Sequence, residues 1–195
     1  MTCIAALVLP DRAGVVMAAD SASTFDGQLV SDDTPKILRK KVGRTGGELL
    51  IGIAGRHSLA QIIAHDLTIS DSPDPDDEAD CNAWAFRIAV AVTDLAVDAR
   101  PPLTTHDGSV DGRGLLAHGG RLWVIGELIA MPVRAYAAIG SGGNYALGAL
   151  HVLDDRGLLL TNPTRALGEA VAAAIRYDTG CSGHIVMEAL VHEAA

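Results

Sequence analysis

The order of apolar segments along the chain predicts an α+β fold in which two packed sheets are each covered by a pair of helices. Strand and helix patterns occur in separate blocks, in the order strands, helices, strands, helices, strand, whereas a parallel sheet of βαβ units would alternate them. Several strand segments are apolar almost throughout, which is typical of sheets covered on both faces. With 195 residues and a hydrophobic fraction of 49%, residues 1–195 are expected to form one domain with a sizeable core.

The first block is predicted to contain two hairpins. Residues 10–14 and 45–47 have the composition of turns, and their glycines can supply the positive φ that tight turns need. The apolar, partly β-branched runs that flank these turns form the strands. The strands are expected at residues 2–9, 15–19, 37–42 and 49–54. The first hairpin ends at Asp20 and the second at Gly55.

Helices are predicted where apolar residues recur every three or four positions. Ser58 is expected to cap the first helix, and Pro101 and Pro102 to stop the second. Residues 70–78 are acidic and contain proline, so we expect a solvated loop between these two helices. The four helices are expected at residues 58–67, 83–99, 144–153 and 164–176.

A second block of strands is predicted between the two helix pairs, and one strand after the last helix. Residues 118–120 contain two glycines and form the turn of a further hairpin. The strands are expected at residues 114–117, 121–125, 135–139 and 184–191.

The balance of charge excludes one large class of partners. The 24 acidic residues outnumber the 15 basic ones and give a formal charge of -9. This charge opposes a phosphate-binding surface, so we expect no nucleic-acid partner. The seven histidines fall into no metal-ligand spacing, and we expect no metal and no other cofactor.

The cysteines and the apolar runs predict a cytoplasmic protein. Cys3, Cys81 and Cys181 are widely spaced and form neither a CxxC pair nor a disulfide framework, which fits a reducing compartment. The sequence shows no secretory leader pattern and no apolar run of membrane-spanning length. We therefore expect a soluble protein with no membrane partner.

Thr2 carries the most specific chemical signal in the sequence. It follows Met1 directly, and a small second residue favours removal of the initiator methionine. Removal would give Thr2 a free α-amine with an ordinary pKa of about 7.7–8.0, which could accept the hydroxyl proton near neutral pH. One residue would then supply both the nucleophile and its base.

Four further features follow Thr2, and each has an ordinary structural explanation when taken alone. Asp20 ends an apolar strand and Lys36 begins another. Gly55 follows a buried strand, where a second backbone can approach closely. Ser141 lies in a glycine-rich turn between a strand and a helix, which matches neither the GxGxxG nor the GxSxG pattern.

In this order, and over nearly the whole chain, the features resemble the β-type subunits of the proteasome and of its bacterial two-ring relative, within the N-terminal nucleophile hydrolases. Any one motif is weak, but the ordered set is specific. Its members are Thr2, Asp20 and Thr24 in a DxxxT arrangement, Lys36, and residues 53–55, 138–143 and 177–183. The resemblance implies a four-layer αββα sandwich of two antiparallel sheets flanked by helix pairs, which agrees with the predicted order of elements.

The resemblance also implies a threonine endopeptidase. The Thr2 hydroxyl would attack a peptide carbonyl, and the Thr2 amine would take its proton directly or through one water. Lys36 would favour the alkoxide and keep the amine neutral, while Asp20 would hold Lys36 in place. Ser141 and Asp178 would hydrogen-bond around the amine and tune its basicity.

The implied substrate is a polypeptide. The Gly55 N–H would donate to the oxyanion, and an extended peptide would add as a strand between the segments around Thr24 and Gly55. Ile53 would line a pocket for a hydrophobic or uncharged residue before the cut. The resemblance further implies self-association into rings or a related oligomer, and an ATPase that unfolds substrates as a partner.

Three questions stay open at this point. Family members place a serine three residues after the late aspartate, where this chain has Cys181, with Ser182 one position later. The same nucleophile could instead serve an amidohydrolase that acts on a small amide. The chain could also be a catalytically silent assembly subunit of a proteasome-like ring, although the joint presence of Thr2, Asp20 and Lys36 argues against silence.

Overall fold

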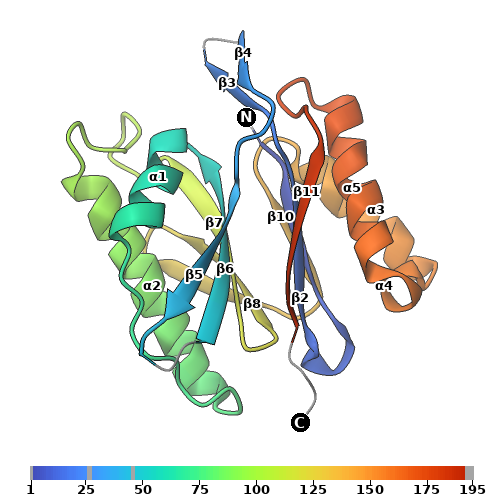
Figure 1. The fold of residues 1–195 in the computed structure, drawn as a ribbon, viewed down its shortest axis with the longest axis horizontal. Helices are drawn as coiled ribbons and strands as arrows, with labels where there is room; N and C mark the ends of the chain where they lie inside the picture. Colours follow the sequence, from blue (N-terminus) through green and yellow to red (C-terminus); the bar gives the residue numbers. More distant parts are fainter. Residues whose placement is uncertain (1, 26–27, 45–46, 192–195) are drawn as a thin grey trace.

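The structure is a sandwich of four layers in the order helices, sheet, sheet, helices (Figure 1). The computed structural model describes residues 2–25, 28–44 and 47–191. Figure 1 shows the layers edge on, with α1 and α2 outside one sheet and α3, α4 and α5 outside the other. The predicted α+β class and αββα architecture are therefore confirmed.

One inner layer is an antiparallel sheet built on the first predicted hairpin. Within the described residues its strands lie in the order β10-β1-β2-β11. Their bounds are β1 Ile4–Val8, β2 Gly14–Asp20, β10 Tyr136–Ile139 and β11 Ile185–Val191. The central strand β2 is buried along its whole length, which explains why its sequence is apolar without alternation. Ile4 pairs with Ala19 on one side and with Ile139 on the other.

The other inner layer is also antiparallel, and its order over the described part of the chain is β5-β6-β7-β8-β9. The bounds are β5 Ile37–Val42, β6 Gly47–Gly55, β7 Gly112–His118, β8 Arg121–Gly126 and β9 Ile129–Val133. Gly55 at the end of β6 pairs with Gly112 at the start of β7. The loop before β7 is thereby held against the end of β6.

Three apolar cores join the four layers. Met17 and Leu115 lie in the core between the two sheets, where both side chains are fully buried. Trp84 belongs to the core under α1 and α2, and Leu167 to the core under α3 and α5. The helices span α1 His57–Asp66, α2 Glu78–Asp98, α3 Gly143–Asp155, α4 Leu158–Thr161 and α5 Pro163–Tyr177. Burying one large apolar side chain contributes about 1.5–3 kcal/mol, so these cores drive the stacking of the layers.

All four predicted helices begin earlier than the sequence predicted, and for α1 and α2 the difference changes the interpretation of the start. α1 begins at His57, and the arginine before it is the N-cap residue, so the prediction of Ser58 as the cap is wrong. α2 begins at Glu78, the last residue of the stretch expected to be a loop. The Asp77 side chain caps α2 by accepting the Asp80 N–H at 2.9 Å. Acidic residues in the first turn are favourable at a helix N-terminus, so this end of the acidic stretch is a helix start rather than a loop.

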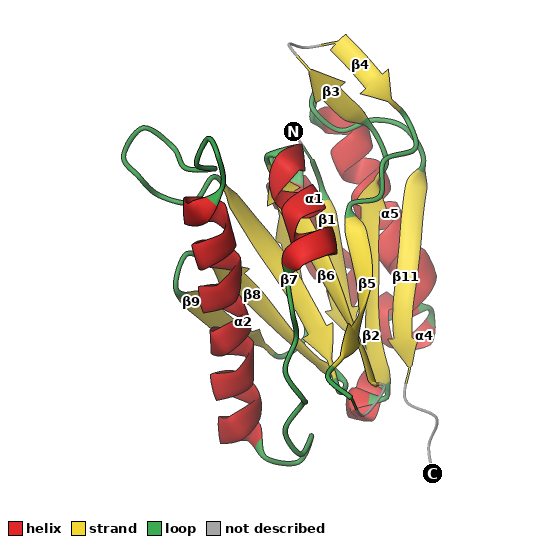
Figure 2. Cartoon of the chain, turned by 60° about the vertical axis from the view of Figure 1, so that its left-hand side comes forward, coloured by secondary structure: helices red, strands yellow, loops and turns green. Residues whose placement is uncertain are grey.

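Three structural features were not predicted from the sequence. Strands β3 (Ser23–Phe25) and β4 (Gln28–Ser31) form a hairpin that projects from the end of the sandwich near the N-terminus (Figures 1 and 2). β9 contains Pro132, which a strand at the edge of a sheet tolerates because no ladder hydrogen bond is lost there. α4 is a single turn between the two predicted helices. Met1 and residues 45–46 of the second predicted turn lie outside the described residues.

Candidate active site

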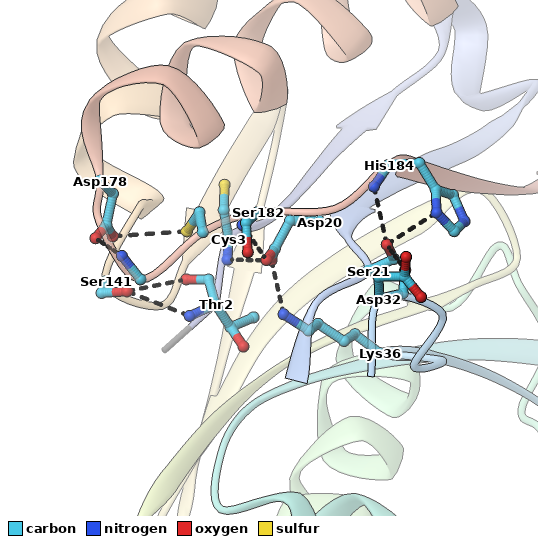
Figure 3. Close-up of polar contacts among 12 residues, drawn as sticks. Thr2, Cys3, Asp20, Ser21, Asp32, Lys36, Ser141, Asp178, Ser182 and His184 are labelled. Atoms are coloured by element: carbon cyan, nitrogen blue, oxygen red, sulfur yellow. Dashed lines mark hydrogen bonds and ion pairs between the residues drawn. The ribbon is translucent and has the colours of Figure 1, made fainter. Parts of the chain in front are cut away.

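Six chain segments bring the predicted catalytic residues to one end of the sandwich. Figure 3 shows Thr2, Asp20, Lys36, Ser141 and Asp178 among them. Neighbouring strands run antiparallel, so the start of β1 lies beside the ends of β2 and β10. The facing sheet contributes the start of β5 and the end of β6, which pair with each other. The residues brought together are Thr2 before β1, Asp20 at the end of β2, Lys36 before β5, Gly55 at the end of β6, Ser141 after β10 and Asp178 after α5.

Asp20 and Lys36 form a buried ion pair between the two sheets. Lys36 Nζ lies 2.8 Å from Asp20 Oδ1, and the two side chains are 8% and 0% exposed. The Cys3 N–H donates to Asp20 Oδ1 at 2.9 Å, and the Ser182 N–H donates to Asp20 Oδ2 at 3.2 Å. A charge buried without a partner is strongly unfavourable, so each member of the pair compensates the charge of the other and holds it in place.

Thr2 is held by its backbone against the turn after β10. Its carbonyl oxygen accepts the Gly142 N–H at 3.2 Å, and its nitrogen donates to Ser141 Oγ at 3.2 Å. Gly140 adopts a φ of +90°, and a Cβ there would overlap with the Thr2 carbonyl oxygen, so this position requires glycine. Figure 3 shows the Thr2 hydroxyl directed toward Lys36 and away from Ser141.

Asp178 lies behind Ser141 in the loop that follows α5. Partial burial acts to raise the pKa of its carboxyl, but hydrogen bonds from the Gly180 N–H, the Ser141 hydroxyl and the Cys181 thiol outweigh burial and lower that pKa below its ordinary value. The Cys181 thiol donates to Asp178 Oδ2 at 3.6 Å. Ser182 instead turns its backbone N–H to Asp20. Cys181 is therefore the residue that contacts Asp178 at the position where the family pattern has a serine.

Gly55 separates two cavities that both reach Thr2. Its φ is +145°, and a Cβ at this position would lie only 2.5 Å from the Asp111 carbonyl oxygen, so there is no room for a side chain. The smaller cavity, of about 70 Å³, is lined by Thr24, Ile53 and Lys36. The larger one is a cleft of about 590 Å³ on the side of Gly140 and Ser141. Thr24 and Ile53 thus lie together beside Gly55.

The sequence did not reveal a second group of contacts around Ser21. This buried serine donates from Oγ to the Asp32 carbonyl oxygen and accepts the His184 N–H at 3.0 Å. His184 Nδ1 lies 3.0 Å from the same hydroxyl, and the Thr34 N–H donates to the Ser21 carbonyl oxygen at 2.8 Å. We call Ser21, His184 and the backbone of Asp32 and Thr34 the Ser21 clasp (Figure 3). It ties the residue after Asp20 to the segment that leads to Lys36, and its partners are too far apart in sequence for a local motif to reveal them.

Among the described residues, no group of three or more His, Cys, Asp or Glu side chains is arranged to hold a metal ion. None of the described helices combines the length and apolar character needed to cross a bilayer.

Two antiparallel sheets between helix layers, with Thr2 just before the first strand, form a fold that this chain shares with solved structures of HslV and BPH. Solved structures with this fold cover nearly the whole chain. Eukaryotic HslV from Trypanosoma brucei superposes with a TM-score of 0.69 at 19% identity, over 98% of this chain and 100% of that one. BPH from Thiobacillus denitrificans in complex with epoxomicin gives a TM-score of 0.72 at 18% identity, over 98% of this chain and 100% of that one.

A second structure of Thiobacillus denitrificans BPH gives a TM-score of 0.71 at 19% identity, over 96% of this chain and 97% of that one. No protein-family model matches the chain, and no curated protein matches its sequence significantly. The resemblance read from the sequence is thus confirmed at the level of the fold.

Proposed function

We propose that this protein is a threonine endopeptidase in which Thr2, freed by removal of Met1, is the nucleophile. The observation that carries the proposal is the meeting of Thr2, the buried Asp20–Lys36 pair and the Ser141 hydroxyl at one end of the sandwich. The fold supports it, because one solved structure with the same fold is that of BPH bound to epoxomicin.

In the proposed reaction, Thr2 Oγ attacks the carbonyl carbon of a peptide bond while its proton passes to the Thr2 amine, directly or through one water. The carbon–nitrogen bond then breaks, and the leaving amine takes that proton. A water molecule hydrolyses the resulting ester and restores the Thr2 hydroxyl. The catalytic cycle therefore needs no group outside the chain apart from water.

The surrounding residues would stabilise the charges that develop. The Lys36 ammonium favours the alkoxide and, by like-charge repulsion, the neutral form of the Thr2 amine, while Asp20 holds Lys36 in position. The Gly55 N–H donates to the oxyanion, a contact worth about 3–4 kcal/mol of the barrier. Ser141, already 3.2 Å from the Thr2 nitrogen, orients the amine, and Asp178 acts through Ser141.

The proposed substrate is an extended polypeptide. It would add as a strand between the segments around Thr24 and Gly55, so that backbone hydrogen bonds supply affinity with little sequence preference. Ala22 and Ile53 also line the small cavity beside these segments. We propose that this cavity accepts a hydrophobic or uncharged side chain of the substrate residue that precedes the cleaved bond.

We further propose that residues 1–195 act as a single domain that assembles into a ring or a related oligomer in the cytoplasm and receives unfolded chains from an ATPase partner. Tyr145 and Val152 support self-association, because both side chains are exposed and their spacing of seven residues places them on one face of α3. Leu147, Leu158 and Leu160 are further exposed apolar side chains of α3 and α4.

The test is intact-mass analysis of the full chain after incubation with epoxomicin. We expect one adduct on the chain that lacks Met1, and hydrolysis of fluorogenic peptides that the adduct abolishes. Thr2→Ala should remove both signals without unfolding the protein. Thr68→Ala, the same change at an exposed residue of a loop, should leave both intact.

Three results would contradict the proposal. Peptide hydrolysis by Thr2→Ala at the wild-type rate would remove Thr2 as the nucleophile. An intact oligomer that lacks Met1 and forms no adduct would favour the silent assembly subunit. Turnover of small amides but not of peptides would favour the amidohydrolase.

A further inference from the structure

The large cleft beside Thr2 has no role in the catalytic steps described above. It is lined by Thr2, Gly55 and Ser141 on one side and by the segment from Val110 to Arg113 on the other. Its volume of about 590 Å³ is large enough for several residues of an extended peptide.

The position of this cleft relative to the small cavity assigns it a part of the substrate. The two cavities share Thr2, Gly55 and Arg56. A carbonyl held by the Gly55 N–H and attacked by Thr2 therefore sits at their boundary. If the residue before the cut fills the cavity lined by Ile53, the residues after the cut lead into the cleft.

Within the described part of the chain, the cleft lining carries one unbalanced positive charge. Arg56 Nε lies 2.7 Å from Asp111 Oδ2, and the Arg56 N–H donates to the Asp111 carbonyl oxygen at 3.3 Å, so these two charges neutralise each other. Arg113 is the remaining charged residue of the lining, and among the described residues its side chain makes no hydrogen bond or ion pair. Glu127, which accepts the Val110 N–H at 3.3 Å, does not line the cleft.

The sheet fixes Arg113 where a leaving segment would pass. Arg113 pairs with Ala54 across β6 and β7, one position from Gly55. The residues on either side of it are Gly112 and Gly114, so no neighbouring side chain on β7 screens its guanidinium. A cation beside the nucleophile attracts anionic groups locally, against the net formal charge of -9 of the whole chain.

We propose that Arg113 selects polypeptides that carry an acidic residue within the first few positions after the cleaved bond. The guanidinium pairs with the aspartate or glutamate carboxylate as the leaving segment lies in the cleft. This proposal rests on the proposed function, because it needs Thr2 as the nucleophile and Gly55 as the oxyanion donor. A partly exposed ion pair of this kind changes kcat/KM by roughly fivefold.

The test compares internally quenched peptides that share one sequence before the cut and differ only after it. Each peptide carries Glu, Gln or Lys at one of the first three positions after the cleaved bond. The full-length enzyme should cleave the best Glu peptide roughly fivefold faster than its Gln partner, as judged by kcat/KM, and the Lys peptide more slowly than both. High salt should reduce the preference, because it screens exposed charges.

Variants of Arg113 distinguish the contribution of its positive charge from that of the shape of its side chain. Arg113→Gln should bring the Glu-to-Gln ratio to about one, Arg113→Glu should invert it, and Arg113→Lys should keep most of it. Arg87→Gln is the matched control, because it removes one exposed arginine from α2 that lines neither cavity. It should leave the ratio unchanged.

Epoxomicin separates failure of this proposal from failure of the proposed function, because it carries no residues after the reactive carbonyl. If the wild-type chain without Met1 forms no adduct, the proposed function fails. If the adduct forms but the Glu-to-Gln ratio is one, or stays at its wild-type value in Arg113→Gln, the Arg113 proposal alone is overturned. It is also overturned if Arg113→Glu changes the rate of adduct formation several-fold, because the cleft would then hold the residues before the cut.

Discussion

At the scale of single residues, the buried ion pair of Asp20 and Lys36 lies next to Thr2 in space. Asp20 is fully buried, yet its two oxygens receive the Lys36 ammonium and two backbone N–H groups. Such a pair is not by itself a source of stability, because desolvation offsets the attraction between its charges. Its position beside the Thr2 hydroxyl supports the catalytic role proposed above.

Lys36→Met should therefore abolish peptide hydrolysis and also destabilise the fold by about 3–5 kcal/mol, because it leaves Asp20 buried without its counter-charge. Urea unfolding measures the second effect. The double variant Lys36→Met with Asp20→Asn should recover a large part of the lost stability but none of the activity. Recovery of activity in the double variant would show that Lys36 serves only to neutralise Asp20.

The buried thiols next to this pair predict a stability change at alkaline pH. Burial, followed by the nearby acidic groups, raises the pKa of both Cys3 and Cys181 to about 12, against an ordinary value of 9.0. Above about pH 9 the unfolded chain releases these protons and the folded chain does not. The stability that the two protonated thiols provide is therefore full below pH 9 and is lost as the pH rises toward 12.

Urea unfolding at pH 7, 9 and 10.5 should show this loss in the wild type and a flatter profile in the double variant Cys3→Ala with Cys181→Ala. The folded wild type should also leave both thiols unmodified by a thiol reagent at pH 8, where almost no thiolate is present. Rapid modification of either residue in the folded protein would contradict the burial.

At the scale of elements, glycine turns set the distance between strands and the candidate nucleophile. The turn after β10 approaches Thr2 so closely that Gly140 has no space for a Cβ. Gly108 has almost the same φ, +87° against +90°, but no atom lies within 4 Å of the position a Cβ would take. Alanine substitutions at these two glycines therefore distinguish the effect of backbone strain from the effect of a steric clash with Thr2.

Gly140→Ala should reduce kcat/KM for peptides by at least about 100-fold, because the displaced Thr2 loses its alignment with Lys36. Gly108→Ala imposes the same left-handed strain and should cost about 1–2 kcal/mol of stability with activity retained. Steady-state kinetics and urea unfolding of both variants test the pair. Equal losses of activity would mean that strain, rather than contact with Thr2, explains the requirement for glycine.

The Ser21 clasp acts at the same scale, since it joins β2 to the segment before β5 and to the segment before β11. Ser21→Ala would leave the His184 N–H and the Asp32 carbonyl without a buried partner, which costs about 1–3 kcal/mol for each group that stays dry. We expect lower stability together with a lower kcat, because Lys36 follows the released segment. His184→Asn keeps the backbone donor and should have the smaller effect on both measurements.

At the scale of the whole molecule, the candidate active site lies at one end of the sandwich, and exposed apolar side chains lie on an outer helix layer. The candidate active site and the projecting β3–β4 hairpin share one end (Figures 1 and 2). The outer face of α3 exposes Tyr145 and Val152, which are 47% and 48% exposed. A second apolar layer on this face would bury both side chains.

Tyr145→Glu with Val152→Glu should therefore convert the proposed oligomer into smaller species in native mass spectrometry. Val97→Glu, which places the same charge at a 47% exposed position on α2, should leave the assembly intact. Dissociation by Val97→Glu alone would move the interface to the opposite helix layer.

Much of this architecture follows from the sequence. Fully buried strands such as β2 must be apolar on both faces, and the apolar residues of amphipathic helices must recur every three or four positions. Local sequence patterns therefore predict the order of the layers. Shorter or edge elements escape such reasoning. β9 contains Pro132, and β3 and β4 are too short to show a period, so only their pairing partners establish them as strands.

The candidate site divides in the same way. Residue types and their order along the chain singled out Thr2, Asp20, Lys36, Gly55 and Ser141, because each stands where a predicted strand begins, ends or turns. The contacts made by Ser21 and Cys181, and the place of Arg113 in the cleft, were decided only by the tertiary structure. Ser21 and His184 are 163 positions apart in the sequence, and Arg113 lies in a cleft beside the candidate nucleophile. Both arrangements depend on how distant segments of the chain pack together, and local side-chain patterns do not predict that packing.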